Sequence, residues 1–278
     1  MFQKRTLVIA TKHKKENAIA PLLLREFEIN AFVPEHFDSD LLGTFSGEIE
    51  RKNDPITTVR EKCLMAMKLS GCDLGIANEG SFGPHPTIFF ANANEEFIIL
   101  IDKKNDLEII EKEISIETNF DKSTINNYEE LLTFAKNNKF PSHAIILKKE
   151  KHFANECDKG IQSWKTLEDR YNVLSGDGDP LIAETDMRAL YNPTRMEVIK
   201  KVTEKLITKM KSCCPKCNTP GFGIVSAKPG LPCEWCKSAT KSIKSVLYQC
   251  QKCNYELEEA NPNNKLLEDP MYCDYCNP

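Results

Sequence analysis

Asp73-Leu-Gly-Ile-Ala-Asn-Glu-Gly-Ser-Phe-Gly-Pro-His-Pro86 is the stretch on which the fold prediction rests. Its apolar start, Leu74 to Ala77, predicts a short buried strand, and the glycine-rich residues that follow predict a loop. A buried strand that leads into such a loop is where α/β proteins place a ligand site. Glu79 and His85 are the reactive side chains of the loop and are therefore our candidate catalytic residues. The alternative is an ordinary turn in which His85 is hydrogen-bonded for structural reasons.

The residues before this stretch predict alternating strands and helices. Thr6–Ala10 and Ile29–Val33 read as strands, and a helix fits between them if Pro21 lies in its first turn. Asp54 as N-cap and Pro55 as first helical residue predict a helix over Pro55–Leu69 that ends at Gly71. Its apolar face is expected to contain Ile56, Val59, Cys63 and Met67.

The residues after this stretch predict a continuation of the same pattern. Thr87–Ala91 and Phe97–Asp102 read as a hairpin joined by Asn92–Glu96. Further expected elements are strands at Leu107–Ile116 and His143–Leu147 and helices at Tyr128–Asn137, Lys159–Tyr171 and from Pro193 onward. The predicted fold class is α/β, a mixed sheet flanked by helices, with a small C-terminal double zinc-ribbon domain.

Composition excludes several classes of protein. The net charge of the 278 residues is −4, so a general polyanion-binding surface is not indicated. No apolar run is long enough for a transmembrane helix, and Lys12, His13 and Lys14 end the first apolar run too early for a signal peptide. We therefore expect a cytoplasmic protein without membrane contact.

Basic residues at three places are candidate ligands of a phosphate group. His13 and Lys15 precede the first helix, Arg51 ends an acidic stretch, and Arg188 and Arg195 flank the start of the last helix. For the first pair the alternative is a solvated lysine cluster. For the arginines it is an internal salt-bridge network with the acids that precede them, Glu184 and Asp186.

The acidic stretch Asp38–Arg51 contains candidate ligands of a hard cation. Asp38 and Asp40, together with Glu79, offer the oxygen ligands that Mg²⁺ prefers. The alternative is a solvated acidic loop.

Nine of the twelve cysteines lie after Ser212, and eight of them form four Cys-x-x-Cys pairs. The pairs are Cys214/Cys217, Cys233/Cys236, Cys250/Cys253 and Cys273/Cys276. Two such pairs complete one tetrahedral site, so the spacing predicts two structural zinc ions. A nested pairing, second with third and first with fourth, and a sequential pairing both remain open. The domain boundaries that follow are 1–211 and 212–278.

Several motifs together resemble a family of uncharacterised bacterial proteins known only as a domain of unknown function. These motifs are Ala10–Glu16, Gly43–Phe45 with Gly47–Arg51, Glu79–Pro86, Glu184–Arg188 with Asn192–Arg195, and Cys273–Pro278. The resemblance spans nearly the whole chain and implies no activity.

A fainter resemblance covers about Thr6 to Phe120. The order of a strand ending in Ala-Thr, a helix, an acidic loop, a second helix and a strand with an acidic glycine motif looks like the inosine triphosphate pyrophosphatases. That resemblance implies a lysine after the first strand that binds phosphate, and acidic groups that bind Mg²⁺. Lys15 and Glu79 lie near the matching places.

Two hypotheses about function follow. In the first, the chain is a Mg²⁺-dependent hydrolase of a nucleotide or another phosphorylated small molecule, with a structural zinc ribbon. In the second it is not catalytic, and the ribbons bind nucleic acid or a protein partner. Lys228, Lys237, Lys241 and Lys244 would then contact phosphates, while Trp235, Tyr248 and Tyr255 are candidates for contact or for local core.

Overall fold

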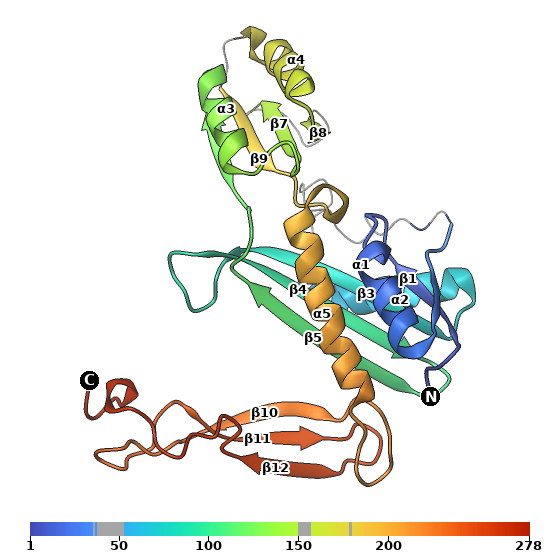
Figure 1. The fold of residues 1–278 in the computed structure, drawn as a ribbon, viewed down its shortest axis with the longest axis vertical. Helices are drawn as coiled ribbons and strands as arrows, with labels where there is room; N and C mark the ends of the chain where they lie inside the picture. Colours follow the sequence, from blue (N-terminus) through green and yellow to red (C-terminus); the bar gives the residue numbers. More distant parts are fainter. Residues whose placement is uncertain (36, 38–52, 150–156, 178–179) are drawn as a thin grey trace. The chain divides into compact units, whose positions relative to one another are not determined.

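The computed structural model describes residues 1–35, 37, 53–149, 157–177 and 180–278. They form two compact units, Met1–Leu206 and Ile207–Pro278. The division falls inside one helix, α5 (Pro193–Lys211), a few residues before the boundary that we expected from the cysteines. Figure 1 shows the elements of both units along the chain. Among the described residues, no helix has the length and apolar character that a membrane span needs.

The first unit is built on a mixed five-stranded sheet, which confirms the predicted α/β class. In sheet order the strands are β2 (Asn30–Phe32), β1 (Thr6–Ala10), β3 (Leu74–Pro84), β4 (Asn92–Asp102) and β5 (Leu107–Ser115). β2 and β3 both lie parallel to β1, whereas β4 and β5 continue the sheet in antiparallel pairing. The two parallel connections contain α1 (Glu16–Phe27) and α2 (Pro55–Ser70), because parallel strands need a long crossover.

The glycine-rich stretch is a strand, and this corrects the central prediction. β3 runs without interruption to Pro84, and every residue from Leu74 onward is paired with β4. The predicted hairpin with its turn at Asn92–Glu96 is also wrong. β4 already begins at Asn92, so these residues belong to a strand, and the turn lies at His85–Ala91. Glycine weakens an isolated strand, but here β4 supplies a backbone partner along the whole length of β3.

The predicted helix signals of α2 are confirmed. Asp54 Oδ1 accepts hydrogen bonds from the amides of Ile56 and Thr57 at 2.9 and 3.1 Å, and Gly71 ends the helix in a left-handed conformation. Val59, Cys63 and Met67 are buried as expected, whereas Ile56 is exposed in the first turn. In α1 the expectation was wrong, because Pro21 lies inside the helix and not in its first turn.

Gly75 allows α2 to lie close to β3. A Cβ atom at this position would lie 2.5 Å from Met67 Cγ and 3.0 Å from Cys63 Sγ. Side chains alternate across a strand, so Glu79 points to the same face as Gly75, toward α2, and Gly80 points to the opposite face. The close approach therefore brings α2 within reach of Glu79.

A second, antiparallel sheet completes the first unit. Its order is β6 (Lys122–Ile125), β9 (Leu181–Thr185), β7 (Ile145–Lys149) and β8 (Cys157–Ile161). Helices α3 (Tyr128–Asn137) and α4 (Trp164–Leu174) pack on it, and α3 has the predicted bounds. The helix predicted from Lys159 begins later, because Ser163 caps α4 and Lys159 belongs to β8. His143, expected to be structural, bonds to Thr194 Oγ1 at 2.9 Å.

The second unit contains a three-stranded antiparallel sheet in chain order, β10 (Gly223–Pro229), β11 (Ile243–Gln249) and β12 (Glu256–Ala260). Its small apolar cluster consists of Phe222, Tyr248 and Tyr255 together with three cysteines, Cys214, Cys250 and Cys253. Tyr248 and Tyr255 are therefore local core, the second of the two roles considered for them. A short 3₁₀ turn, η4 (Pro270–Tyr272), precedes the last cysteine pair.

Candidate functional site

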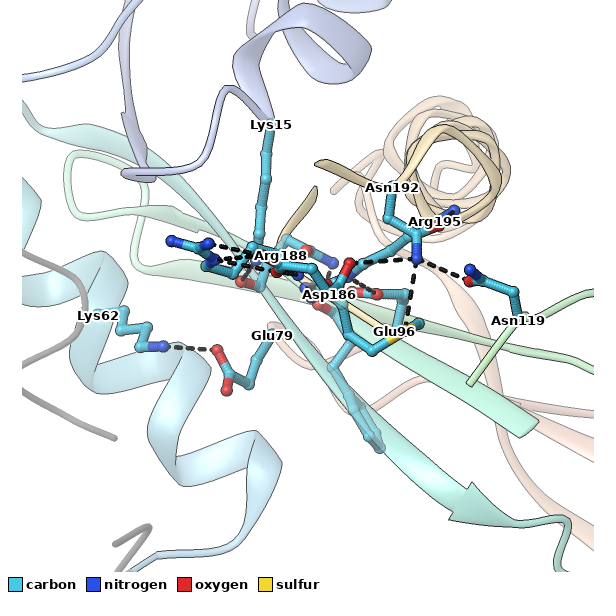
Figure 2. Close-up of polar contacts among 12 residues, drawn as sticks. Lys15, Lys62, Glu79, Glu96, Asn119, Asp186, Arg188, Asn192 and Arg195 are labelled. Carbon is cyan, nitrogen blue, oxygen red and sulfur yellow. Dashed lines mark hydrogen bonds and ion pairs between the residues drawn. The ribbon is translucent and has the colours of Figure 1, made fainter. Parts of the chain in front are cut away.

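The carboxyl end of β1 is the place where the candidate site lies. β1 ends at Ala10, opposite Ala77 of β3, whereas β3 continues beyond this point. Lys15, the N-cap residue of α1, lies here, and its Nζ donates a hydrogen bond to the carbonyl oxygen of Asn78 at 2.9 Å. Figure 2 shows this buried side chain directed at the strand. The lysine predicted to bind phosphate thus lies beside the middle of β3.

Glu79 lies on the α2 face of the sheet and forms an ion pair with Lys62. The distance from Lys62 Nζ to Glu79 Oε2 is 2.6 Å, and both side chains are buried (Figure 2). Burying an ion pair costs more desolvation free energy than forming one at the surface. The buried pair is therefore stable only with good hydrogen-bond geometry, as the short distance here indicates. Lys62 therefore holds the predicted catalytic carboxylate in one position.

The opposite face of the sheet carries a second buried ion pair, Glu96 with Arg195. Arg195 Nε lies 2.7 Å from Glu96 Oε1, and both side chains have 0% exposure. Arg195 also donates from Nη1 to the carbonyl oxygen of Met187 at 2.6 Å. A Cβ atom at Gly80 would lie 2.4 Å from Arg195 Nη2 and 2.5 Å from Glu96 Oε1, so this pair needs glycine on the neighbouring strand.

We call these five ionisable residues, Lys15, Lys62, Glu79, Glu96 and Arg195, the ionic cluster. Its two carboxylates pair with Lys62 and Arg195, which leaves the charge of Lys15 in excess. Within the described residues, no carboxylate forms an ion pair with Lys15. Burial, followed by the positive charge of Arg195, lowers the pKa of Lys15 to about 7. An anion beside Lys15 would stabilise its charged form.

Two buried amide oxygens lie on the face that carries Glu96. Asn78 Oδ1 and Asn94 Oδ1 have no hydrogen-bond partner among the described residues. Asn78 Nδ2 donates to the carbonyl oxygen of Phe97 at 2.9 Å, which supports the assignment of its oxygen. Strand pairing places both asparagines on the same face as Glu96. Since an unmatched buried acceptor is costly, these oxygens are places where a ligand or water would donate.

The structure separates the two predicted catalytic residues Glu79 and His85. They are six residues apart on extended chain, which corresponds to about 20 Å. His85 Nδ1 accepts hydrogen bonds from the amides of Thr87 and Ile88 at 3.1 and 3.0 Å and so closes the turn before β4. His13 lies in the turn before α1, where its amide donates to the hydroxyl of Thr11.

Three other predicted residues, Asp38, Asp40 and Arg51, lie outside the described residues.

Arg188 forms an internal salt bridge, which was the alternative to phosphate binding that we considered for it. Its Nη2 lies 2.6 Å from Asp186 Oδ2, and its Nε bonds to Asp186 Oδ1 at 3.0 Å. Glu184 is not part of that pair, because it bonds to two lysines of neighbouring strands.

Sequence reasoning missed Lys62 and Glu96. Lys62 stands next to Cys63 and three residues after Val59, so it lies on the buried side of α2, and a lysine there was a usable signal. Glu96 was assigned to a turn, and its burial depends on Arg195, which is 99 residues away in the chain. No local pattern could have revealed that contact.

The eight predicted cysteines form two groups of four, and the grouping differs from both pairings that we considered. One group is Cys214, Cys217, Cys250 and Cys253, and the other is Cys233, Cys236, Cys273 and Cys276. The first pair thus joins the third and the second joins the fourth, an interleaved arrangement.

The length of β11 explains why the nested pairing is wrong. The second cysteine pair precedes this strand and the third follows it, so its seven residues separate them by roughly 20 Å. β10 lies antiparallel to β11 and returns the chain in the same way, which places the first and third pairs at one end of the sheet. The second and fourth pairs then meet at the other end.

The sulfur geometry of both groups fits zinc. Within each group the sulfur atoms lie within 4.8 Å of one another, and two of the separations are 3.7 and 3.6 Å in the first group and 3.8 and 3.6 Å in the second. A tetrahedral ion with bonds of about 2.3 Å requires sulfur separations of about 3.8 Å. Two zinc ions could therefore be held, each by four thiolates, with no position left for water.

A family model for the Domain of unknown function (DUF6671) matches residues 62–278. No curated protein and no solved structure matches the chain, so the likeness to the inosine triphosphate pyrophosphatases gains no support from either. The matched region includes both cysteine groups and every member of the ionic cluster except Lys15. Since the match covers well over half of the sequence, the chain belongs to the family defined by this domain, DUF6671.

Proposed function

We propose that the unit Met1–Leu206 is a metal-dependent hydrolase of a nucleotide or another phosphorylated small molecule, in a reducing compartment such as the cytoplasm. The observation that carries this proposal is the buried amino group of Lys15, which forms no ion pair with a carboxylate in the described part of the chain and would be charged beside an anion. Phosphate is an anion that such a charge favours. The place also suits a ligand, because α/β sheets bind ligands at the carboxyl ends of parallel strands, here β1 between β2 and β3.

In this proposal Lys15 leaves the Asn78 carbonyl for a phosphate oxygen, and Glu79, held by Lys62, orients the attacking water. Mg²⁺, when bound beside Glu79, would neutralise phosphate charge. Asn78 and Asn94 lie on the opposite face of the sheet from Glu79, so a ligand would have to pass the end of β1 to reach both faces. Their buried oxygens would there accept hydrogen bonds from N–H groups, which a nucleobase offers and an inorganic phosphate does not. This supports a nucleotide as the substrate class.

Glu79→Gln should abolish hydrolysis and also lower the stability of the unit, because Lys62 stays buried without its counter-charge, so circular dichroism must show that the variant is folded. The amide keeps the size of the side chain and a hydrogen-bond acceptor for Lys62, but it loses the charge that orients water. The measurement is release of phosphate and pyrophosphate from nucleoside triphosphates with Mg²⁺ or Mn²⁺. We expect a loss of at least about 100-fold, the usual range for a general base.

The matched control is Glu108→Gln, the same chemical change in a partly exposed pair with Arg60 of the same unit. Its rate should equal that of the wild type. Equal rates for wild type and Glu79→Gln would remove Glu79 from the mechanism, and no turnover of any triphosphate would refute the hydrolase proposal.

Affinity for a nucleotide should fall as the pH rises above about 7. Lys15 has a lowered pKa of about 7, so it is charged below this pH and neutral above it, and an anionic ligand binds the charged form. The expected decrease is about tenfold per pH unit until the pKa of the complex is reached. Calorimetry with a non-hydrolysable triphosphate analogue between about pH 7 and 9 measures it. Lys15→Met should bind weakly and without this dependence, and a flat wild-type profile would contradict the role of Lys15.

The alternative hypothesis, that the second unit binds nucleic acid, is weakened by the contacts of three of the four lysines proposed to bind phosphate. Lys228 pairs with Glu258 at 2.7 Å, Lys241 pairs with Asp274 at 2.9 Å, and Lys237 Nζ donates to the carbonyl oxygen of Glu234. Lysines that already bond to acceptors of the same unit are weaker phosphate ligands, so the hydrolase is the function that we propose.

A further inference from the structure

The two cysteine groups of the second unit are built from the same turn but carry different residues at its tip. In each of the four turns the amide four residues after the first cysteine donates to the carbonyl oxygen of that cysteine, at 2.8 to 3.1 Å. The third residue of each turn is therefore an equivalent position. It is Lys216 and Lys252 in the group at one end of the sheet, and Trp235 and Tyr275 in the other.

The two aromatic tips do not contribute to a core. Trp235 is 75% exposed and Tyr275 is 83% exposed. The aromatic residues near the other group behave differently, since the Phe222 ring lies 5.6 Å from that of Tyr248 and packs in the local core. Lysine serves equally well at the same place in the turn, so the turn does not need an aromatic residue. Large exposed aromatic side chains that no packing requires are typical of contact surfaces.

Further apolar residues extend this surface along the last part of the chain. Leu266, Met271 and Tyr272 are each more than half exposed. They belong to a segment that lies beside the second cysteine pair. Glu268 of this segment forms an isolated β-bridge with Cys233, and the amide of Glu268 donates a hydrogen bond to the carbonyl oxygen of Pro232. We call Trp235, Leu266, Met271, Tyr272 and Tyr275 the aromatic surface.

The charge around the aromatic surface is negative. Residues 231–241 and 265–278 contain three lysines and four carboxylates, and one carboxylate directly precedes each aromatic tip, Glu234 before Trp235 and Asp274 before Tyr275. The matching segments of the other group, residues 212–222 and 242–255, contain three lysines and no carboxylate. Four thiolates around Zn²⁺ add the same two negative charges to both ends, so the difference between the ends remains.

We infer that the aromatic surface binds a basic segment of another protein, in which lysine or arginine side chains alternate with apolar ones. Aromatic faces attract cations and also bury apolar side chains. The carboxylate of Glu234 next to Trp235 would pair with the same cations, whereas Asp274 pairs with Lys241. A nucleic acid would stack on the tips but would be repelled by the acidic surroundings, whose three lysines already bond to acceptors of the same unit. This inference concerns only the second unit and stands apart from the proposed hydrolase.

The test exchanges the tips of one group for those of the other. The double variant Trp235→Lys with Tyr275→Lys places lysine at both tips of the aromatic surface. Lysine already occupies the equivalent positions of the other group, so the zinc content should stay the same. The matched control is Lys216→Ala with Lys252→Ala. The probe is a labelled peptide in which arginine and leucine alternate with glycine and serine, titrated by fluorescence anisotropy into the zinc-loaded full chain. The tip exchange should weaken binding at least about tenfold, and the control should not.

The companion probes identify the occupant. The same peptide with glutamate in place of arginine should bind at least about tenfold more weakly to the wild type. Equal binding of the basic peptide by wild type and tip exchange would overturn the inference, as would no binding of that peptide to the wild type. An oligonucleotide that binds more tightly than the peptide and loses affinity on tip exchange would also overturn it, as would a dimer in solution that the tip exchange dissociates.

Discussion

Cys253→Ser should reduce the zinc content from about two ions per chain to about one and unfold the sheet of residues 207–278. The reason is that this unit has little else to stabilise it. Its apolar cluster consists of three aromatic residues and of cysteines that are themselves predicted ligands. In such small domains the binding free energy of zinc is folding energy, with values of about 10–16 kcal/mol for zinc-finger peptides.

The matched control is Cys213→Ser, which changes the exposed cysteine directly before Cys214 that belongs to neither group. It should keep both ions. Elemental analysis gives the zinc content, and near-ultraviolet circular dichroism and proteolysis report the fold. Loss of an ion in the control, or two ions in Cys253→Ser, would contradict the assignment of ligands.

Double variants test the interleaved pairing. Cys217→Ser with Cys253→Ser removes two ligands of one group, so one ion should remain, whereas Cys217→Ser with Cys236→Ser should lose both. The nested and sequential arrangements both predict loss of two ions from the first of these variants. Residues 1–206 contain none of the eight ligands and have hydrophobic clusters of their own, so their fold should survive removal of zinc. Global unfolding on zinc removal would show that the two units depend on each other.

Local signals allowed much of the fold to be predicted. The cap formed by Asp54, the proline that follows it and Gly71 define α2, and Asn127 as N-cap starts α3 at the predicted residue. Four cysteine pairs identified the members of the two four-cysteine groups, because the spacing within each pair is a local property. These features depend on hydrogen bonds between residues a few positions apart, which a sequence pattern contains.

The errors have a common physical cause, which is pairing over long sequence distances. β3 looked like a loop because its glycines break isolated strands, but the partner strand and the Glu96–Arg195 pair decide the conformation at Gly80. The grouping of the cysteine pairs likewise depends on how far β11 carries the chain. Of the predicted cleft residues, Lys15, Glu79 and Arg195 do meet at β3, but their partners Lys62 and Glu96 were found only in the structure.

Arg195→Met should destabilise the unit Met1–Leu206 by about 3–5 kcal/mol, the cost of leaving one partner of a buried ion pair charged and alone. Glu96 has no exposure in the structure, so its carboxylate cannot reach water without local unfolding. Chemical denaturation of wild type and variant measures the difference. The control is Arg60→Met, which breaks the partly exposed pair with Glu108 and should cost no more than about 1 kcal/mol.

The double variant Arg195→Met with Glu96→Leu separates stability from ligand binding. Removing both charges leaves no buried carboxylate without a partner, so most of the lost stability should return, because apolar replacements of buried pairs are often neutral. Binding of the triphosphate analogue should not return if Arg195 contributes positive charge next to Lys15, whose pKa it lowers. In that case the cluster has lost a cation that the ligand needs, while the opposite effects of Arg195 and Glu96 on the pKa of Lys15 are removed together. If binding recovers together with stability, the role of Arg195 is only structural, as the ion pair that joins α5 to β4. The anion site then consists of Lys15 and the residues on the α2 face.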